Sequence, residues 1–346
     1  MLNPLNPPSQ GDFESILMRE QDFLQKLKSV PFSFHPVLIG IGDDAAVIGD
    51  DVVVTTDTLV DGVHFSRSYF SPEQIGKKAV EVNVSDVLAM GGIPTYLVLS
   101  VSVPTTVNEH YLLRFYEGVK EACSKYGIAL VGGDTSKAPH DFSITITLLG
   151  TVIKEELLLC SGAQVGDVIA VSGELGASAV GLELLQGTLR LPFPESDIQW
   201  LKNMHLEPIA QFETGRFLAQ SGMVHALTDV SDGIASDMRK ITTNSRVSAV
   251  LDFTKIPVFS TVQKAMSIMK KPLWQSGVFG GEEYEFLFTV GKEQFSPLEQ
   301  AAKMKGILLT EIGFVDAGED GRVYVEENSG EKKEFTAMGF DHFAKN

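Results

Sequence analysis

The sequence predicts two domains, an α+β domain over residues 1–153 and an α/β domain over residues 154–346. The chain has 346 residues, which is more than one ordinary hydrophobic core supports. The first half places two capped helices among about four β-rich segments, which is typical of an α+β layer arrangement, ferredoxin-like in outline. In the second half helices and strands follow one another regularly, which is typical of an α/β sheet.

The first elements follow from periodicity and from helix caps. Residues 13–27 carry apolar side chains at helical spacing, and the β-branched segment 52–60 predicts a strand. The next helix begins at Ser71, a typical N-cap residue, with Pro72 in its first position. Gly91 marks the end of this helix.

A second helix lies between Asn108, its expected N-cap, and Gly127, its expected stop. One strand is expected before it, at residues 96–104, and two after it, at 128–133 and 141–153. With the earlier strand, these segments give the sheet of about four strands.

The pattern changes near residue 154. Within residues 154–173 we expect a domain boundary and then a strand. The helices expected after this point cover residues 177–187, 208–222 and 231–245. The strands that alternate with them are expected at residues 224–230, 247–253, 284–290 and 307–315.

The composition is that of a globular protein and narrows the choice of partners. Hydrophobic residues make up 44% and charged residues 21%, and the formal net charge is −17. This charge argues against nucleic acid and anionic membranes as main partners. Cys123 and Cys160 are too few for a disulfide framework, and neither a signal peptide nor an apolar run of membrane-spanning length is found. We therefore expect a cytoplasmic protein.

Carboxylates recur beside glycines at the expected ends of strands and helices. They are Asp43, Asp44, Asp57, Asp86, Asp134, Asp229, Asp232, Glu282 and Glu283. One such residue alone often forms a turn or caps a helix. Several together, beside glycines that let the backbone approach a ligand, indicate a site for a hard metal such as Mg²⁺ and for phosphate. A zinc site does not fit, because cysteine and histidine are scarce and poorly spaced.

The common nucleotide-binding motifs do not explain this pattern. The sequence contains no G-x-x-x-x-G-K-[ST], and GKKA at residues 76–79 lies inside an expected helix. Gly40, Gly42 and Ala45 match G-x-G-x-x-A. A dinucleotide-binding turn requires a helix after this motif, but the segment that follows is an expected strand, so we reject it.

Seven motifs follow one another along the chain, in the order GIGDDAAVI, TTDTLVDGVHF, NVSDVLAMGGIP, LVGGDTS, VSDGIASD, GGEEYEFLF and GFDHF. Together, from about residue 13 to residue 343, they closely resemble those of thiamine-monophosphate kinase, within the wider group of aminoimidazole-ribonucleotide synthetase-like ATP enzymes. The resemblance implies phosphorylation of thiamine monophosphate to thiamine diphosphate by ATP, with several Mg²⁺ ions as cofactors. It also implies a homodimer formed through the N-terminal sheets.

The resemblance further implies roles for individual residues. The positions that resemble metal ligands are Asp44, Thr55, Thr56, Asp57, Asp86, Asp134, Asp229 and Asp232, and the expected catalytic set among them is Asp44, Asp86, Asp134 and Asp229. The positions that resemble ATP contacts are Tyr116, Gly133, Asp134, Cys160 and Ser231. The positions that resemble contacts to thiamine monophosphate are His64, Glu282 and Phe340. Asp43 is expected to cap the turn or to support Asp44.

Two positions depart from the family pattern. Cys160 stands where the family usually has an arginine that contacts the ATP phosphates, and a thiol cannot make that charged, bidentate contact. The consequence is either weaker ATP binding or a charge supplied by Lys137 or Lys154, and Cys160→Arg should lower the KM for ATP. Glu283 replaces the family's aspartate and reaches one methylene further.

The chemistry implied by the resemblance needs no general base. The acceptor is a phosphate monoester with a second pKa of about 6, so its oxygen is largely ionised at neutral pH. We therefore expect direct in-line transfer without a phospho-enzyme. Two alternatives remain: another ATP-using enzyme of the same superfamily, or a catalytically weakened nucleotide-binding regulatory protein in which Cys160 marks the decay. A selenophosphate synthetase is disfavoured, because no cysteine precedes Cys123.

Overall fold

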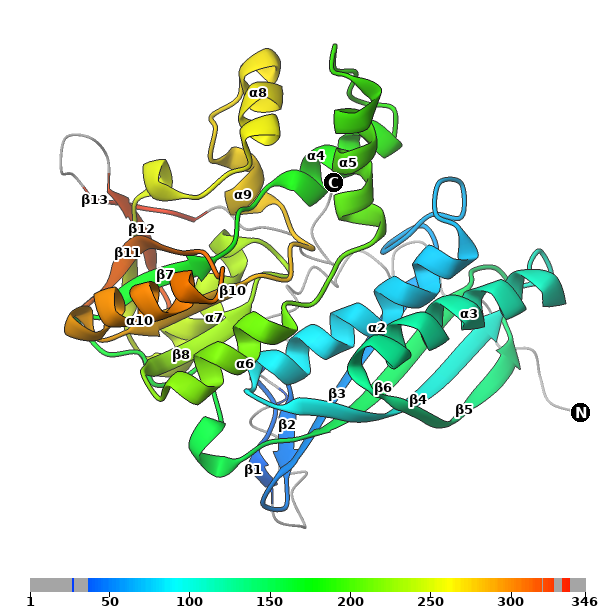
Figure 1. Ribbon diagram of the computed structural model, residues 1–346, viewed down its shortest axis with the longest axis horizontal. Helices are drawn as coiled ribbons and strands as arrows, with labels where there is room; N and C mark the ends of the chain where they lie inside the picture. The colour runs from blue at the N-terminus through cyan, green and yellow to red at the C-terminus, as the bar shows by residue number, and fades with distance from the viewer. Residues whose placement is uncertain (1–26, 28–36, 319, 327–331, 337–346) are drawn as a thin grey trace, which may run out of the picture.

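The computed structural model describes residues 27, 37–318, 320–326 and 332–336. The chain forms two β-sheets with helices packed against them (Figure 1). The expected helix at residues 13–27 lies outside the described residues except for Leu27, and Phe340 also lies outside them. None of the described helices is long and apolar enough to cross a membrane.

The first sheet has six strands in the order β1-β2-β3-β6-β4-β5. They are β1 (Val37–Ile39), β2 (Ala46–Ile48), β3 (Val52–Val60), β4 (Ile93–Val103), β5 (Ala129–Lys137) and β6 (Ser143–Thr151). Neighbouring strands are antiparallel except β4 and β5, which are parallel. This corrects the expectation of about four strands with a ferredoxin-like outline. β1 and β2 have three residues each, too few to show the alternation that predicts a strand.

Two helices cover one face of this sheet, α2 (Pro72–Ala89) and α3 (Glu109–Tyr126) (Figure 1). α2 begins at a capping box, in which Ser71 Oγ accepts the Gln74 N–H and the Gln74 side chain accepts the Ser71 N–H. The N-cap expected from sequence is therefore confirmed.

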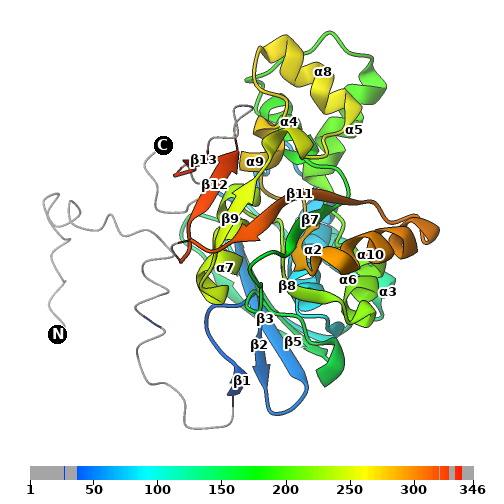
Figure 2. The same ribbon diagram turned by 90° about the vertical axis from the view of Figure 1, so that its left-hand side faces the viewer.

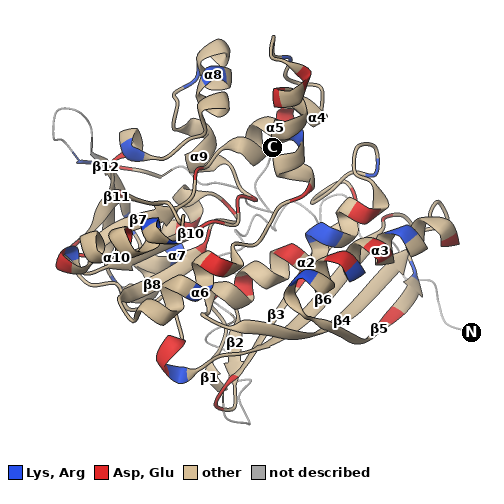
Figure 3. Ribbon diagram, in the orientation of Figure 1, with Lys and Arg blue, Asp and Glu red and all other residues tan. Residues whose placement is uncertain are grey.

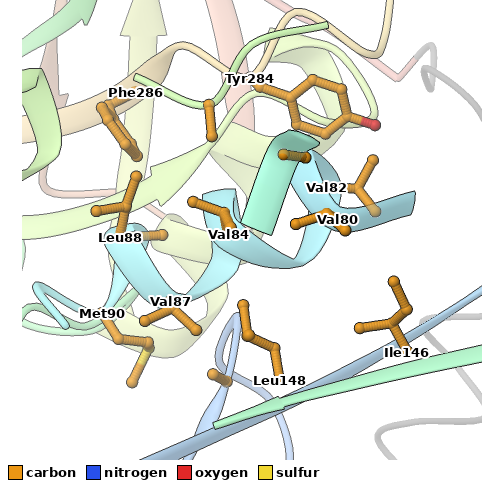
Figure 4. Close-up of a cluster of buried hydrophobic side chains, with 14 of the residues drawn as sticks. Val80, Val82, Val84, Val87, Leu88, Met90, Ile146, Leu148, Tyr284 and Phe286 are labelled. Atoms are coloured by element: carbon orange, nitrogen blue, oxygen red, sulfur yellow. The ribbon is translucent and has the colours of Figure 1, made fainter. Parts of the chain in front are cut away.

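α2 lies between the two halves of the molecule. Ile146 and Leu148 of the first sheet pack on one side of it, and Tyr284 and Phe286 of the second half pack on the other (Figure 4). Because α2 is enclosed in this way, polar side chains on it must find partners inside the protein. Its buried polar residues are Lys78, Glu81, Asn83 and Ser85.

The second sheet has seven strands in the order β13-β12-β9-β11-β7-β10-β8. They are β7 (Val168–Ser172), β8 (Val224–Asp229), β9 (Ser248–Leu251), β10 (Phe286–Val290), β11 (Leu309–Asp316), β12 (Val323–Glu326) and β13 (Lys332–Glu334). Every pair is antiparallel except β9 with β12. This corrects the α/β expectation to a mixed, mainly antiparallel α+β sheet. β7 and β8 follow one another in sequence, but β10 lies between them, and local patterns do not encode such neighbours.

The helices of the second half are α4 (Ala177–Leu185), α5 (Glu195–Leu206), α6 (Phe212–Ser221), α7 (Ile234–Ser245), α8 (Ser260–Met269), α9 (Gln275–Phe279) and α10 (Lys292–Met304). α6 and α10 lie on one side of the second sheet and α7 on the other (Figure 2). The core beneath α6 and α10 is continuous with that of the first sheet, since Val168 and Phe286 share one cluster with Leu88. The boundary after residue 153 stays a prediction.

Candidate functional site

A cavity of about 1340 Å³ is lined by residues from both halves of the chain. Carboxylates from the segments flanking β8 and β10 and from α2 line one end of it. Figure 3 shows in red where Asp and Glu residues lie on the ribbon. We call this group the acidic cluster, and its members are Asp44, Asp57, Asp86, Asp229 and Asp232. All five were predicted as metal ligands from the sequence, and the fold brings them to one wall although they come from four separate segments.

Asp44 lies in the turn between β1 and β2, and its side chain is 4% exposed. Thr228 Oγ1 donates a hydrogen bond to Asp44 Oδ1 over 2.9 Å, and Cys160 Sγ donates to Oδ2 over 3.6 Å. Burial raises the pKa of Asp44 well above its usual value, and the charge of Asp229 adds to this, whereas Lys240 opposes it. The negative charge of the buried Asp44 carboxylate is therefore only partly compensated by nearby positive charge.

Asp43 holds the turn and also lines the cavity. Its Oδ1 accepts the Asp44 N–H over 3.2 Å and the Cys160 N–H over 3.0 Å. Gly42 precedes it with φ +114°, a left-handed value that a side chain would strain. Asp43 therefore makes the capping contact expected from sequence and ties the turn to the segment around Cys160.

The alternation of β3 divides its three candidate ligands between two faces. Thr55 and Asp57 lie on the face covered by α2, where Thr55 Oγ1 donates to Asp86 Oδ2 over 2.6 Å. Burial raises the pKa of Asp57 to about 6, and burial together with the Asp57 charge raises that of Asp86. Thr56 lies on the opposite face, is exposed, and donates its hydroxyl to the Ile146 carbonyl oxygen over 2.9 Å.

Asp229, at the end of β8, connects the second half to α2. Ser85 Oγ donates to its Oδ2 over 2.6 Å, while Oδ1 is buried with no hydrogen-bond partner among the described residues. Burial raises the pKa of Asp229. Ser231 and Asp232 follow in the loop before α7 and also line the cavity. A buried carboxylate oxygen without a donor is what a cation would satisfy.

Sequence reasoning missed two residues of α7 at this end of the cavity, Lys240, which lines it, and Asp237, which is buried behind Lys240. Lys240 Nζ lies 3.0 Å from Asp237 Oδ1, 3.9 Å from Asp232 Oδ2 and 4.0 Å from Asp44 Oδ1. The spacing of Asp237 and Lys240, three apart on a helix, was the available signal. Burial raises the pKa of Asp237 to about 7 despite the nearby ammonium.

The other end of the cavity carries paired charges. Lys78 Nζ lies 2.5 Å from Glu282 Oε1 and donates to the His64 carbonyl oxygen over 2.8 Å, and His205 Nδ1 lies 3.1 Å from Glu282 Oε2. Burial alone would raise the pKa of Glu282, but the charges of Lys78 and His205 outweigh it and lower that pKa. Burial lowers the pKa of His205 to about 4. Lys78 and His205 were not predicted as site residues.

The donor atoms of the acidic cluster suit a hard divalent cation. They are carboxylate oxygens with nearby hydroxyls, and Mg²⁺ takes a few such ligands while keeping water in its other positions. Within the described ranges, one trio has ligand atoms within 4.8 Å of one another, Asp43, Asp44 and Cys160. Its thiol is wholly buried with a raised pKa, caused first by burial, and Asp43 Oδ1 already accepts two backbone N–H groups. The cluster as a whole fits a cation better than this trio.

Comparison with known proteins agrees with this geometry. A family model for the AIR synthase related protein, N-terminal domain, matches residues 42–152, and one for the C-terminal domain matches residues 164–326. Thiamine-monophosphate kinase of Bacillus subtilis is 34% identical over 94% of this chain and 100% of its own length. The chain belongs to the thiamine-monophosphate kinase family.

Solved structures of this family extend the agreement to the fold. One described as AaThiL complexed with AMPPCP and TMP is 34% identical, with a TM-score of 0.80 over 94% of this chain and 97% of that one. The thiamine monophosphate kinase of Aquifex aeolicus is 33% identical, with a TM-score of 0.75 over 90% of this chain and 95% of that one.

Three of the residues that the family resemblance assigned to ATP lie away from the cavity. Tyr116 is on α3, and Gly133 and Asp134 are on β5, the outer strand of the first sheet. None of the three lines the cavity within one chain. The order of strands puts β6 and β4 between β5 and β3, which separates Asp134 from β3 by about 14 Å at ordinary strand spacing.

The two residues that depart from the family pattern, Cys160 and Glu283, both lie outside the cavity lining. Cys160 is fully buried, does not line the cavity, and faces Asp44. Neither Lys137 nor Lys154 lines the cavity either. Glu283 Oε1 accepts the N–H groups of Gly176 and Ser178 at the start of α4, and burial raises its pKa to about 8. Glu283 therefore supports a helix terminus rather than the cavity wall.

Proposed function

We propose that this chain transfers the γ-phosphoryl group of ATP to the phosphate of thiamine monophosphate, giving thiamine diphosphate and ADP. The observation that carries the proposal is the acidic cluster, five buried or half-buried aspartates at one end of a large cavity, with the ammonium of Lys240 near two of them. Family membership supplies the substrates, since relatives 34% identical are thiamine-monophosphate kinases and one structure is described with AMPPCP and TMP.

We further propose that Mg²⁺ ions are held by Asp44, Asp57, Asp86, Asp229 and Asp232, with Thr55 orienting Asp86. Bound there, Mg²⁺ would supply the positive charge that offsets the repulsion between the two phosphates, which is about 4 kcal/mol for two like charges 4 Å apart at an effective dielectric of 20. Ser85 and Thr228 hold Asp229 and Asp44 in place.

The remaining work of the protein is positioning. The acceptor oxygen is already ionised at neutral pH, so no general base is required, and His205, with a pKa lowered to about 4 by burial, would be a weak one. Lys78 and Asp86 are eight residues apart on α2, which places the two ends of the cavity about 12 Å apart along the helix. That span suits a substrate whose ring system lies by Glu282 and His64 and whose phosphate meets the acidic cluster.

A homodimer would complete the site. β5 is an outer strand, and all nine of its residues are exposed, including Leu130 at 45% and Val131 at 58%. Unpaired strand edges of this kind are normally covered. We propose that β5 of a second copy covers the first sheet and carries Gly133 and Asp134 to the ATP site, which is the homodimer expected through the N-terminal sheets.

An assay of ADP formation against a panel of phosphate monoesters tests the activity. ADP release that requires both thiamine monophosphate and Mg²⁺ supports the proposal. Binding of ATP without turnover on any acceptor would replace it with the regulatory interpretation.

Mixing two inactive variants tests the dimer. If Asp44 and Asp134 act from different chains, co-refolded Asp44→Asn and Asp134→Asn proteins form hybrid dimers with one intact site, and about a quarter of the wild-type activity returns. If the two residues act within one chain, or the protein is monomeric, the mixture stays as inactive as its parts.

A further inference from the structure

The ammonium of Lys240 lies among carboxylates at the acidic end of the cavity. Its Nζ is bonded to Asp237 Oδ1 at 3.0 Å and lies farther from two members of the acidic cluster, at 3.9 Å from Asp232 and 4.0 Å from Asp44. Asp44 belongs to the first half of the chain and the others to the second. The ammonium therefore links the two halves through charge.

Asp237 fixes the position of this ammonium. It is fully buried and does not line the cavity, and its Oδ2 accepts the Asp232 N–H over 3.1 Å. One oxygen thus holds the loop that carries Asp232, and the other holds Lys240. A lysine anchored at one carboxylate, on a flexible four-carbon stem, keeps its ammonium near the cluster without a fixed bond to it.

The other cationic side chains of the cavity are engaged elsewhere. Lys78 bonds to Glu282, Arg239 to the Ala235 and Phe335 carbonyl oxygens, Lys271 to Glu183 and Arg322 to Glu334. Of the basic side chains that line the described cavity, Lys240 is the one whose nearest acidic partners include the acidic cluster.

We propose that Lys240 is a built-in counter-ion, which holds Asp44 and Asp232 together when no divalent metal is bound and competes with the metal for these carboxylates. The inference rests on the proposed metal-binding role of the acidic cluster. Its physical basis is that a unit positive charge about 4 Å from a carboxylate both stabilises that carboxylate and repels an incoming cation. Metal binding then requires the ammonium to turn away, with Asp237 as its pivot.

The test is direct metal binding to the full chain without nucleotide, using Mn²⁺ as a paramagnetic probe at pH 8.5. Lys240→Met, which keeps the length of the side chain and removes its charge, should bind the first Mn²⁺ at least tenfold more tightly than wild type. Lys240→Arg keeps the charge and should stay near the wild-type affinity. Lys255→Met removes an exposed ammonium paired with Glu311 and serves as the matched control, with unchanged affinity.

Thermal unfolding gives a second readout that an ordinary structural ion pair would not produce. In EDTA, Lys240→Met should melt below wild type because the carboxylates lose their counter-ion. At saturating Mn²⁺ this deficit should shrink, because the metal then supplies the charge at Asp44 and Asp232 and only the lost partner of Asp237 still counts.

Three outcomes are distinguishable. Equal or weaker Mn²⁺ binding by Lys240→Met, or a melting deficit that is as large at saturating metal as in EDTA, overturns the role of Lys240 and leaves the metal site standing. Absence of Mn²⁺ binding in wild type and every variant overturns the metal site itself, and this inference with it. Binding by Lys240→Met alone would support the competition in its strongest form.

Discussion

The two ends of the cavity both carry buried charge, but they balance it differently. At one end the acidic cluster holds five aspartates, of which Asp44 and Asp232 lie about 4 Å from the ammonium of Lys240, and burial raises the pKa of Asp44, Asp86 and Asp229. At the other end Glu282 meets Lys78 and His205, and its pKa is lowered. The first end has an excess of negative charge that a ligand must neutralise, whereas the second is neutralised by the protein itself.

This difference predicts which substitutions mainly affect catalysis and which mainly affect the stability of the fold. An excess of buried charge of one sign costs free energy of folding, and proteins retain such groups where a ligand later compensates them. A buried pair with both partners present is already compensated, and removing one partner exposes the cost of the other. Substitutions at the acidic end should therefore affect catalysis, and substitutions at the paired end should affect stability.

The largest effect is expected for Asp44→Asn. Loss of one carboxylate that stabilises charge during phosphoryl transfer should lower kcat by about 10²- to 10³-fold, with an unchanged circular dichroism spectrum. Asp43→Asn is the matched control, because Asp43 Oδ1 already accepts two backbone N–H groups and an amide oxygen can accept them too, so its loss in kcat should be much smaller. Near-normal turnover by Asp44→Asn would remove the acidic cluster from the mechanism.

Breaking the paired end should destabilise the protein. Lys78 is 1% exposed, so Lys78→Met leaves Glu282 without its closest cation and should cost about 3–5 kcal/mol in the free energy of unfolding, measured with urea. The double variant Lys78→Met with Glu282→Gln removes both charges and should recover part of the loss. A double variant as unstable as Lys78→Met alone would show that packing, not charge, accounts for the effect.

A smaller effect is expected from pH in the metal-free protein. Burial raises the pKa of Asp237 to about 7, of Glu285 to about 7 and of Glu283 to about 8. In the unfolded chain these groups are ionised well below pH 6, so the folded state binds more protons and its stability is lost as the pH rises through the folded pKa values. The free energy of unfolding in EDTA should therefore fall from about pH 6.5 to 8.5.

Two features localise this pH effect. Glu282 has a lowered pKa and so loses its contribution only under acidic conditions, outside this range. Glu283→Gln should flatten the fall, since a neutral amide replaces one of the titrating groups. A free energy of unfolding that rises with pH over the same range would contradict the burial of these carboxylates.

Much of the acidic cluster could be predicted from the sequence, because each member lies in a short motif at the end of a strand or in a helix. Asp44, Asp57 and Asp229 are examples, although the sequence did not show that they share one wall. The capping box at Ser71 was also local and therefore visible. Strand order and direction were not, since they depend on pairings such as β10 between β7 and β8.

The residues that were missed are those whose role depends on long-range neighbours. In the sequence, Lys78 is an ordinary lysine on a helix. Only the folded chain places Glu282 beside it, because Glu282 lies in the loop before β10, 204 positions later. Lys240 meets Asp44 across the two halves in the same way. Conversely, Asp134 has the expected motif but lies on an outer strand, where a single chain gives it no contact with the cavity.

The smallest effect is expected from small substitutions of Cys160, which contacts Asp44 of the acidic cluster but does not line the cavity. A small side chain leaves the backbone N–H bond to Asp43 in place, so Cys160→Ala removes only the weak thiol bond to Asp44 and should lower kcat less than about tenfold, while Cys160→Ser should match wild type. The family's arginine predicts that Cys160→Arg lowers the KM for ATP, but the side chain is fully buried against Asp44. An arginine there must displace the turn, so we expect kcat to fall instead, and separate measurement of KM and kcat decides between the two.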